Sequence, residues 1–288
     1  TDDLVLVVNP DLLVPPTIIS ETVSCSRRAV LKSRVGSTGL TSKAALLGTM
    51  RHELFERSMR SQDFSVQAAG KFVHAISREF AGSLVALGIT NAEAQKEVIR
   101  VLPQLQQFAL NYISFGMLPA TRAPAKVRGS ILEGNGIQPD LHFLAGQVHA
   151  TEESHLSPEL GMKGNIDCTI QAKTHELHFS GRPEGAPQHF LYSIELKTGH
   201  NQTTQNAHMA QLALYTLMLK IRYGSGAGNA ADSGVLLYLN NEGCRAVRVK
   251  PMLNELKSLI GQRNVVASEM KKSSRPRGVV LNFDDEST

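Results

Sequence analysis

Two short β-branched stretches of the chain carry residue types that could form a hydrolytic metal site. Asp167 lies in the run at residues 164–170, and Glu195 and Lys197 lie in the run at residues 192–197. Both runs are typical of strands, in which side chains alternate between faces, so Glu195 and Lys197 share one face. If Asp167 is on the neighbouring strand of a hairpin, two carboxylates and an ammonium group meet at one point. A hard divalent cation and an attacking water require such a set, which predicts a metal-dependent nuclease.

The composition is ordinary for a soluble globular protein, with 42% hydrophobic and 19% charged residues in a chain of 288. This length allows one large domain or two modest ones. The sequence has no run of about 18 apolar residues that could span a membrane, and no signal peptide begins it. We therefore expect no membrane partner and no secretion, and the missing initiator Met suggests a fragment.

Basic side chains form two groups in a chain whose net charge is +4, which permits a polyanionic partner. Each group could contact phosphates, and each is equally consistent with solvated surface charge. The groups are Arg27, Arg28, Lys32 and Arg34 near the N-terminus, and Lys271, Lys272, Arg275 and Arg277 near the C-terminus.

The three cysteines, Cys25, Cys168 and Cys244, are too few and too scattered for a disulfide framework. This pattern fits a reducing compartment. Cys168 directly follows Asp167 and so faces away from it, which predicts a small core residue. Cys244 follows a predicted turn and has no predicted role.

The first half of the chain is predicted to be helical. Residues 4–24 are expected to be extended because prolines prevent a long helix there, and a helix is expected to begin near Ser24. Helical apolar periodicity then covers residues 42–61, 66–87 and 91–115.

From residue 126 onward, short apolar runs predict a sheet, with strands at 127–132, 141–144, 164–170 and 190–196. A Gly- and Pro-rich loop is expected between the two motif strands, at 174–188. A strong helix, a hairpin and a closing helix that has Pro251 in its first turn are expected at 203–222, 234–249 and 251–270. We infer one domain over residues 1–270, helical at 20–120 and with its sheet core at 126–250, followed by a mobile tail at 271–288.

Three further residues occupy suggestive positions on the predicted helices. Gln211 and Tyr215 are four residues apart, so they present an amide and a phenol on one helix face. His52 follows a Gly-Thr pair and precedes Glu53. Taken alone, a helical His or a Gln and Tyr pair is more often structural, but the proximity of Gln211 and Tyr215 to the Glu195 strand favours a functional interpretation.

Together these motifs resemble the RecB-like nucleases of the PD-(D/E)XK superfamily. More narrowly, they resemble the nuclease domain of the eukaryotic replication helicase-nucleases that trim Okazaki-fragment flaps and resect DNA ends. The resemblance extends over residues 9–270 and rests on segments 9–31, 48–56, 157–167, 195–199 and 211–215. It implies a restriction-endonuclease-like α/β fold, in which a mixed sheet is flanked by helices.

The resemblance also implies a metal site for Mg²⁺ or Mn²⁺. Its ligands would be Asp167, Glu195, the Leu196 carbonyl and His52. The bound metal would lower the pKa of water and neutralise charge on the phosphate.

The remaining residues of the implied site act on water and on DNA. Lys197 would orient or activate the water, and Gln211 and Tyr215 would position the strand. Glu152 or Glu153 would add an outer carboxylate, although their interpretation as surface acids is at least as good.

Family members also hold a 4Fe-4S cluster, with one Cys before the His motif and a C-terminal trio spaced roughly Cys-x2-Cys-x5-Cys. Cys25 matches the first ligand, and Arg27 and Arg28 beside it are predicted DNA contacts, but no trio follows Tyr215. The cluster cannot close within this chain, so either the chain stops short of the trio or this member has lost the cluster. No Gly-x4-Gly-Lys-Ser/Thr loop is present, so the helicase domain of the full-length family is not predicted here.

We expect a nuclease that cleaves single-stranded DNA, such as 5′ flaps and resected ends, in replication and repair. The resemblance places it in the nucleus, with the mitochondrion as an additional candidate location and a single-strand-binding protein as a candidate partner. Two alternatives stay open at this point: a catalytically inactive DNA-binding domain that lacks its cluster, and an unrelated α/β scaffold whose acids are surface charge.

Overall fold

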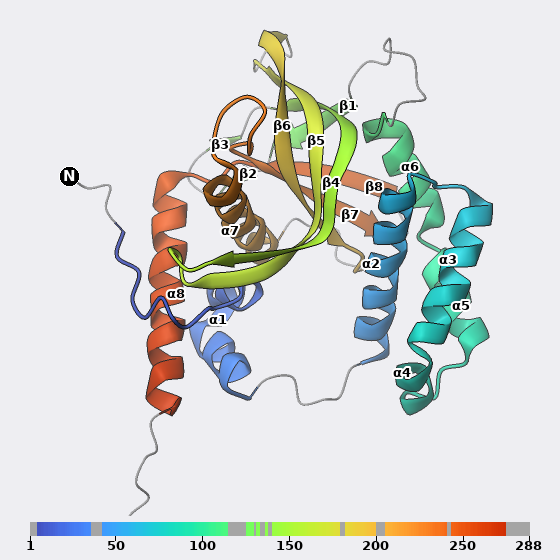
Figure 1. The fold of residues 1–288 in the computed structure, drawn as a ribbon, viewed down its shortest axis with the longest axis horizontal. Helices are drawn as coiled ribbons and strands as arrows, with labels where there is room; N and C mark the ends of the chain where they lie inside the picture. Colours follow the sequence, from blue (N-terminus) through green and yellow to red (C-terminus); the bar gives the residue numbers. More distant parts are fainter. Residues whose placement is uncertain are drawn as a thin grey trace, which may run out of the picture.

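The computed structural model describes residues 5–35, 42–114, 125–129, 131–132, 136–137, 140–178, 182–199, 205–240 and 243–274. These residues form an α/β molecule in which a mixed sheet lies between two groups of helices (Figure 1). Helices α2 to α6 cover one side, and α1, α7 and α8 cover the other. The predicted α/β class is confirmed, and the arrangement is consistent with a restriction-endonuclease-like fold.

The first half is helical, as its periodicity predicts, with α1 (Pro16–Val35), α2 (Lys43–Ser61), α3 (Val66–Glu79), α4 (Ala81–Ala86), α5 (Asn91–Ile99) and α6 (Leu102–Tyr112). The side chains of Ser42, Ser65 and Thr90 cap α2, α3 and α5 by accepting backbone N–H groups. The helices predicted at 66–87 and 91–115 are each divided in two. Pro103 in the first turn of α6 explains the second division, because proline has no N–H to continue the preceding helix.

The expected extended segment at residues 4–24 is wrong from Pro16 onward. Helix α1 begins there because proline is well suited to a first helical position, where its missing N–H costs no hydrogen bond. The helix is interrupted at Cys25, whose φ of −165° and ψ of 107° are extended. The helix predicted near Ser24 is therefore the second part of α1.

The sheet contains β1 (Ala125–Gly129), β4 (Leu141–Ser157), β5 (Met162–Leu177), β6 (Pro183–Lys197), β7 (Gly234–Asn240) and β8 (Gly243–Val249), in the order β1-β4-β5-β6-β7-β8. Strand β1 closes it into a barrel by pairing antiparallel with β4 and parallel with β8. Strands β6 and β7 are parallel, whereas β4-β5, β5-β6 and β7-β8 are antiparallel. The short strands β2 (Ile131–Leu132) and β3 (Gly136–Ile137) form a separate pair.

The loop predicted at residues 174–188 is wrong, because β5 and β6 continue through it as a hairpin. Thr174 pairs with Gln188 and Leu177 with Pro183, with a register shift after Thr174. Gly185 lies at this irregularity with a φ of +74°, which glycine adopts without strain, and His175 Nε2 contacts its carbonyl oxygen. The strand predicted at 141–144 is likewise only the start of β4, and the predicted 127–132 strand is divided between β1 and β2.

The C-terminal elements follow the expected order. Helix α7 (Asn206–Tyr223) and the β7-β8 hairpin match their predictions, and α8 (Leu253–Ser274) is the closing helix. Pro251 precedes α8 instead of standing in its first turn, and α8 extends into the predicted tail. Residues 275–288, including Arg275 and Arg277, lie outside the described residues.

The two sides of the sheet face different cores. Cys168, Ile194 and Leu196 are buried with α2 to α6, as predicted for Cys168, whereas Leu191, at an alternate position of β6, is buried with α1, α7 and α8. Because side chains alternate between faces along β6, Glu195 and Lys197 project from the opposite face to Ile194 and Leu196, toward α7. None of the helices in the described part of the chain combines the length and apolar composition that a membrane span needs.

Candidate active site

The β5-β6 hairpin brings the two predicted acids together. Asp167 and Glu195 each lie one residue beyond the Cys168 and Ile194 pair of the ladder. Because alternate side chains point to opposite faces, both acids project away from the core that buries Cys168 and Ile194. The hairpin on which the sequence hypothesis depends is therefore present.

Asp167 is held by main-chain and side-chain contacts. Its Oδ2 accepts the Leu196 N–H at 2.7 Å, and its Oδ1 lies 3.5 Å from Nδ1 of His52. Helix α2 supplies His52. Burial alone would lower the pKa of His52, but the hydrogen bond and negative charge of Asp167 outweigh burial and raise it. Asp167 therefore links the backbone of β6 to α2.

Glu195 is buried, and its two carboxylate oxygens differ. Oε1 accepts from Lys197 Nζ at 2.7 Å and from Gln211 Nε2 at 2.6 Å. Oε2 is buried and has no hydrogen-bond partner. Burial, and then the charge of Asp167, raise the pKa of Glu195 to about 7. The surrounding protein groups therefore disfavour the charged form of Glu195.

Helix α7 places Gln211 and Tyr215 against the acids. The Gln211 Oε1 also accepts from Lys197 Nζ at 3.1 Å, so one amide contacts both members of the Glu195 and Lys197 pair. Tyr215 is buried, which raises its pKa. A Cβ at Gly164 would lie 3.0 Å from the Tyr215 ring, so the glycine before Asp167 makes room for this phenol.

The two upstream acids have different surroundings. Glu152 has a φ of +46° and is exposed as a residue. Partial loss of water around its carboxylate, and then the charges of Asp167 and Glu56, raise its pKa. Glu153 is buried in another cluster, where it accepts from Tyr223 Oη at 2.5 Å and lies 3.2 Å from His155 Nε2. Of these two acids, only Glu152 therefore has a charge that interacts with the charge of Asp167.

Sequence reasoning missed Glu56, a buried acid on α2. It pairs with Arg60 and accepts from Thr151 Oγ1 at 3.2 Å. Burial raises its pKa above the ordinary value, although Arg60 opposes this. The available signal was spacing, because Glu56 follows His52 by four residues and so lies on the same helix face.

The donor chemistry at the acid pair fits a hard divalent cation. Such cations prefer oxygen ligands, and the orphaned Glu195 Oε2 beside Asp167 is an oxygen that nothing in the described chain satisfies. Within the described ranges, no group of three or more His, Cys, Asp or Glu side chains is arranged to hold a metal ion. The protein side chains that fit the cation are therefore the carboxylate pair, with the main chain of Leu196 beside them.

The predicted iron-sulfur and DNA contacts lie on α1, which packs against α7 and α8. Cys25, Arg27 and Arg28 are exposed, whereas Cys168 is buried and Cys244 is partly buried. Much of the neighbouring positive charge is paired, because Arg28 and Lys32 contact Glu21 and Arg34 contacts Glu269. In the other basic group, Lys271 contacts Asn9 and Lys272 contacts Glu269. None of these contacts connects the basic residues or Cys25 to Asp167 or Glu195.

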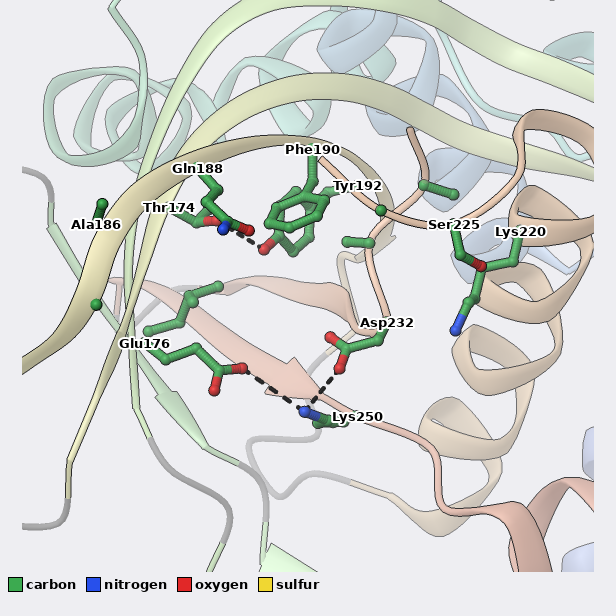
Figure 2. A pocket seen from close by; sticks show the side chains of 15 residues that line it. Thr174, Glu176, Ala186, Gln188, Phe190, Tyr192, Lys220, Ser225, Asp232 and Lys250 are labelled. Atoms are coloured by element: carbon green, nitrogen blue, oxygen red, sulfur yellow. Dashed lines mark hydrogen bonds and ion pairs between the residues drawn. The ribbon is translucent and has the colours of Figure 1, made fainter. Parts of the chain in front are cut away.

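A cavity of about 450 Å³ lies elsewhere, among β5, β6 and the ends of β7 and β8 (Figure 2). Phe190 and Tyr192 form one wall. On the other wall, Lys250 Nζ lies 2.6 Å from Asp232 and 3.7 Å from Glu176, and the Arg248 guanidinium contacts both acids. The two positive and two negative charges therefore largely neutralise one another. None of the predicted site residues lines this cavity.

A mixed sheet that carries paired acids and a lysine beneath a helix places the protein in the restriction-endonuclease-like class. The family model described as DNA replication factor Dna2 matches residues 1–172, which is more than half of the chain. The chain belongs to the Dna2 family.

Several curated relatives share this similarity, and each is described as a DNA replication ATP-dependent helicase/nuclease. JHS1 of Arabidopsis thaliana is 26% identical over 272 residues, covering 93% of this chain and 19% of that protein. DNA2 of Gallus gallus is 28% identical, covering 93% and 25%, and DNA2 of Homo sapiens is 25% identical, covering 81% and 21%. The chain thus spans about a fifth to a quarter of the length of these relatives.

One solved structure, described as the crystal structure of SSO0001, aligns with 84% of this chain and 85% of its own at 13% identity. The TM-score of that alignment is 0.27.

Proposed function

We propose that this chain hydrolyses phosphodiester bonds in single-stranded DNA, such as 5′ flaps and resected ends, with Mg²⁺ or Mn²⁺. The observation that carries the proposal is the buried, unpartnered Glu195 Oε2 beside Asp167. The helicase/nuclease names of the relatives support the same activity class. The alternative of an unrelated scaffold whose acids are surface charge is disfavoured, because Glu195 is buried and the charge of Asp167 raises its pKa.

Asp167 and Glu195 would hold the cation together with the Leu196 carbonyl. The resemblance places His52 among the ligands, but its Nδ1 contacts Asp167 and the described residues contain no set of three such ligands, so we propose that His52 orients Asp167 instead. When bound, the cation would lower the pKa of an attacking water and neutralise charge on the phosphate. The Leu196 N–H fixes Asp167, and the His52 contact on the other carboxylate oxygen orients it from α2. These contacts place the acid before any substrate binds.

Lys197 would orient the water and stabilise the charge that develops on the phosphate. Its ammonium is already positioned by Glu195 and Gln211, so little reorganisation is needed during reaction. Gln211 and Tyr215 would then position the DNA strand along α7. Glu152, the acid that shares the field of Asp167, would act from outside the ligand set.

The wider setting of the protein is part of the same proposal. We place it in the nucleus, with the mitochondrion as an additional candidate location and a single-strand-binding protein as a candidate partner. The helicase domain would be the one that the longer relatives' names include. Cys25 would be the first ligand of a 4Fe-4S cluster, and its exposed position at the break in α1 leaves its thiol accessible. The remaining ligands would have to come from outside this chain, because Cys168 is buried in β5.

Cleavage of a labelled 5′-flap oligonucleotide tests the proposed function. We expect cleavage with Mg²⁺, none with EDTA, and a loss of at least about a hundredfold in Asp167→Ala, as removal of transition-state stabilisation predicts. Single-stranded DNA binding should survive in this variant, because the substitution removes an acid and leaves the basic residues in place.

Two outcomes of this assay would count against the proposal. Wild-type cleavage by Asp167→Ala would show that the reaction occurs elsewhere. A wild-type chain that binds the flap but never cuts it would favour the alternative, a catalytically inactive DNA-binding domain.

A further inference from the structure

A row of three side chains crosses the sheet from the candidate active site toward β8. In the strand registers, Lys197 of β6 pairs with Tyr238 of β7, and Tyr238 pairs with Arg245 of β8. Paired residues on neighbouring strands project to the same face. The row lies on the α7 face, because Tyr238 packs in a cluster with Met209 and Leu212 of α7.

His208, in the first turn of α7, lies over the middle of this row. Its Nδ1 is 3.1 Å from the Tyr238 hydroxyl. Burial, followed by the charge of Lys197, lowers the pKa of His208 to about 4, so the imidazole is neutral near pH 7. If the phenol donates to Nδ1, the proton of the neutral ring is on Nε2, which makes Nε2 a hydrogen-bond donor.

Arg245 forms the outer end of the row. Its guanidinium carbon is 4.7 Å from the centroid of the Tyr238 ring, which is within the range of a cation-π contact, and the residue is exposed. Two strand spacings separate β6 from β8, so Arg245 starts roughly 10 Å from Lys197. The aromatic ring thus supports an exposed guanidinium at a fixed place beside the site.

The α7 face of the sheet is negative on one side of the candidate active site and positive on the other. Glu152 and Glu56 raise the negative potential on the β4 and α2 flank, where they affect one another and Asp167. The side toward β7 and β8 instead carries the positive charges of Lys197 and Arg245 and the hydrogen-bond donor of His208. The N-terminal end of α7 adds the positive end of its dipole to this second flank.

We infer that Arg245 and His208 bind the backbone phosphates of single-stranded DNA next to the phosphate that is cut. This inference rests on the proposed function and extends it by naming where the strand leaves the site. A guanidinium fork and a neutral N–H donor are suited to phosphate oxygens, and neither reads a base sequence by itself. Tyr238 acts as a positioning residue, since its ring supports Arg245 and its hydroxyl contacts Nδ1 of His208.

Binding and cleavage of a single-stranded oligonucleotide by Arg245→Ala test this inference. We expect the Kd and KM to rise by about tenfold with little change in kcat, and the salt dependence of log K to fall by about 0.7, which is the value for one lost phosphate contact on a single strand. Tyr238→Phe keeps the ring beneath Arg245, so it should weaken binding less than His208→Ala.

Arg222→Ala is the matched control. Arg222 also lies over a tyrosine, 5.5 Å from the Tyr223 ring centroid, but it is 14 residues farther along α7, roughly 21 Å from His208. We expect its loss to leave the KM and the salt slope unchanged. Thermal unfolding of each variant would show whether a weakened variant is merely unfolded.

A second measurement locates the contact on the DNA. A single neutral methylphosphonate, placed one or two linkages from the mapped cut on either side, should weaken wild-type binding at one position and have no added effect in Arg245→Ala. Two results would overturn the inference and leave the nuclease assignment intact. The first is that the methylphosphonate and Arg245→Ala weaken binding independently at every position tested. The second is that Arg245→Ala has the wild-type KM while Asp167→Ala is inactive. Absence of cleavage by the wild type would count against the proposed function, whereas the binding data would still report on Arg245.

Discussion

At the scale of single residues, the candidate site is a small network of opposite charges with one unsatisfied oxygen. Glu195 receives Lys197 and Gln211 on one oxygen only, and Asp167 takes its hydrogen bond from the main chain of Leu196. A buried carboxylate oxygen without a partner is costly. A cation at the acid pair would remove this cost, which explains why the arrangement is physically reasonable for a metal enzyme.

Lys197→Ala should reduce turnover more than it reduces metal affinity. The ammonium contacts Glu195 and Gln211 and would act on water and phosphate, so it is not a metal ligand. Isothermal titration with Mn²⁺ should therefore give near-normal binding, while cleavage of the flap oligonucleotide falls by about a hundredfold. Loss of Mn²⁺ binding in this variant would make Lys197 a structural partner of the acids instead.

Glu153 should control stability at acidic pH. Burial alone would raise its pKa, but hydrogen bonds from His155, Thr169 and Tyr223 outweigh burial and lower it to about 2. Because the pKa of Glu153 is lower in the folded state, its carboxylate stabilises the folded state at pH values above its unfolded pKa, near 4.5. This stabilisation is lost as the pH falls from 4.5 toward 2. We expect Glu153→Gln to lower the free energy of unfolding by about 2 kcal/mol at pH 7, with the difference narrowing below pH 4.5.

The neighbouring residue provides the control for this prediction. The pKa of Glu152 is raised, so its charge opposes folding, and Glu152→Gln should not destabilise the protein at pH 7. Urea denaturation of both variants between pH 3 and pH 7 makes the comparison. Equal losses in the two variants at neutral pH would contradict the account of Glu153.

At the scale of elements, the sequence predicts those segments whose local pattern decides their structure. The amphipathic helix at residues 42–61, the motif strands and the hairpin at 234–249 follow from periodicity and turn residues. The continuation of β5 and β6 through residues 174–188 does not, because pairing between Thr174 and Gln188 outweighs the local turn signals.

The same limit applies to the site. Asp167, Glu195 and Lys197 can be found in the sequence because they lie in strand-like runs of known alternation. Tyr238 and Arg245 cannot, since they become neighbours of Lys197 only through the registers of β6, β7 and β8. Strand register is a property of the folded sheet, and no short segment contains it.

Gly161→Ala should be strongly destabilising because it affects the turn between β4 and β5. Gly161 has a φ of +59°, and a Cβ there would lie 2.0 Å from the Arg263 guanidinium. Backbone strain and displacement of a buried side chain together predict a loss of about 3 kcal/mol in the free energy of unfolding. Urea denaturation measures this loss.

Gly70→Ala is the matched control, because Gly70 is an exposed glycine inside α3 with nothing within 4 Å of an added Cβ. It should gain up to about 1 kcal/mol from helix propensity. A Gly161→Ala variant as stable as the wild type would show that Arg263 does not fix this turn.

At the scale of the whole molecule, distant segments are tied together around the site. Arg263 of α8 is fully buried, and it donates to the carbonyl oxygens of Gly161 at 3.0 Å and Asn9 at 2.8 Å. Strand β1 closes the sheet between β4 and β8. The N-terminal segment, the β4-β5 turn and the closing helix therefore support the strand that carries Asp167, although they lie far apart in the sequence.

The Mg²⁺ dependence of cleavage by Glu195→Gln tests the central claim most directly. Glutamine keeps nearly the same shape and removes only the negative charge whose Oε2 is unpartnered. If the acid pair holds the cation, the cleavage rate on single-stranded DNA should fall by at least about a hundredfold at saturating Mg²⁺, and the half-maximal Mg²⁺ concentration should rise. A variant that cleaves at the wild-type rate with the wild-type Mg²⁺ midpoint would contradict the account.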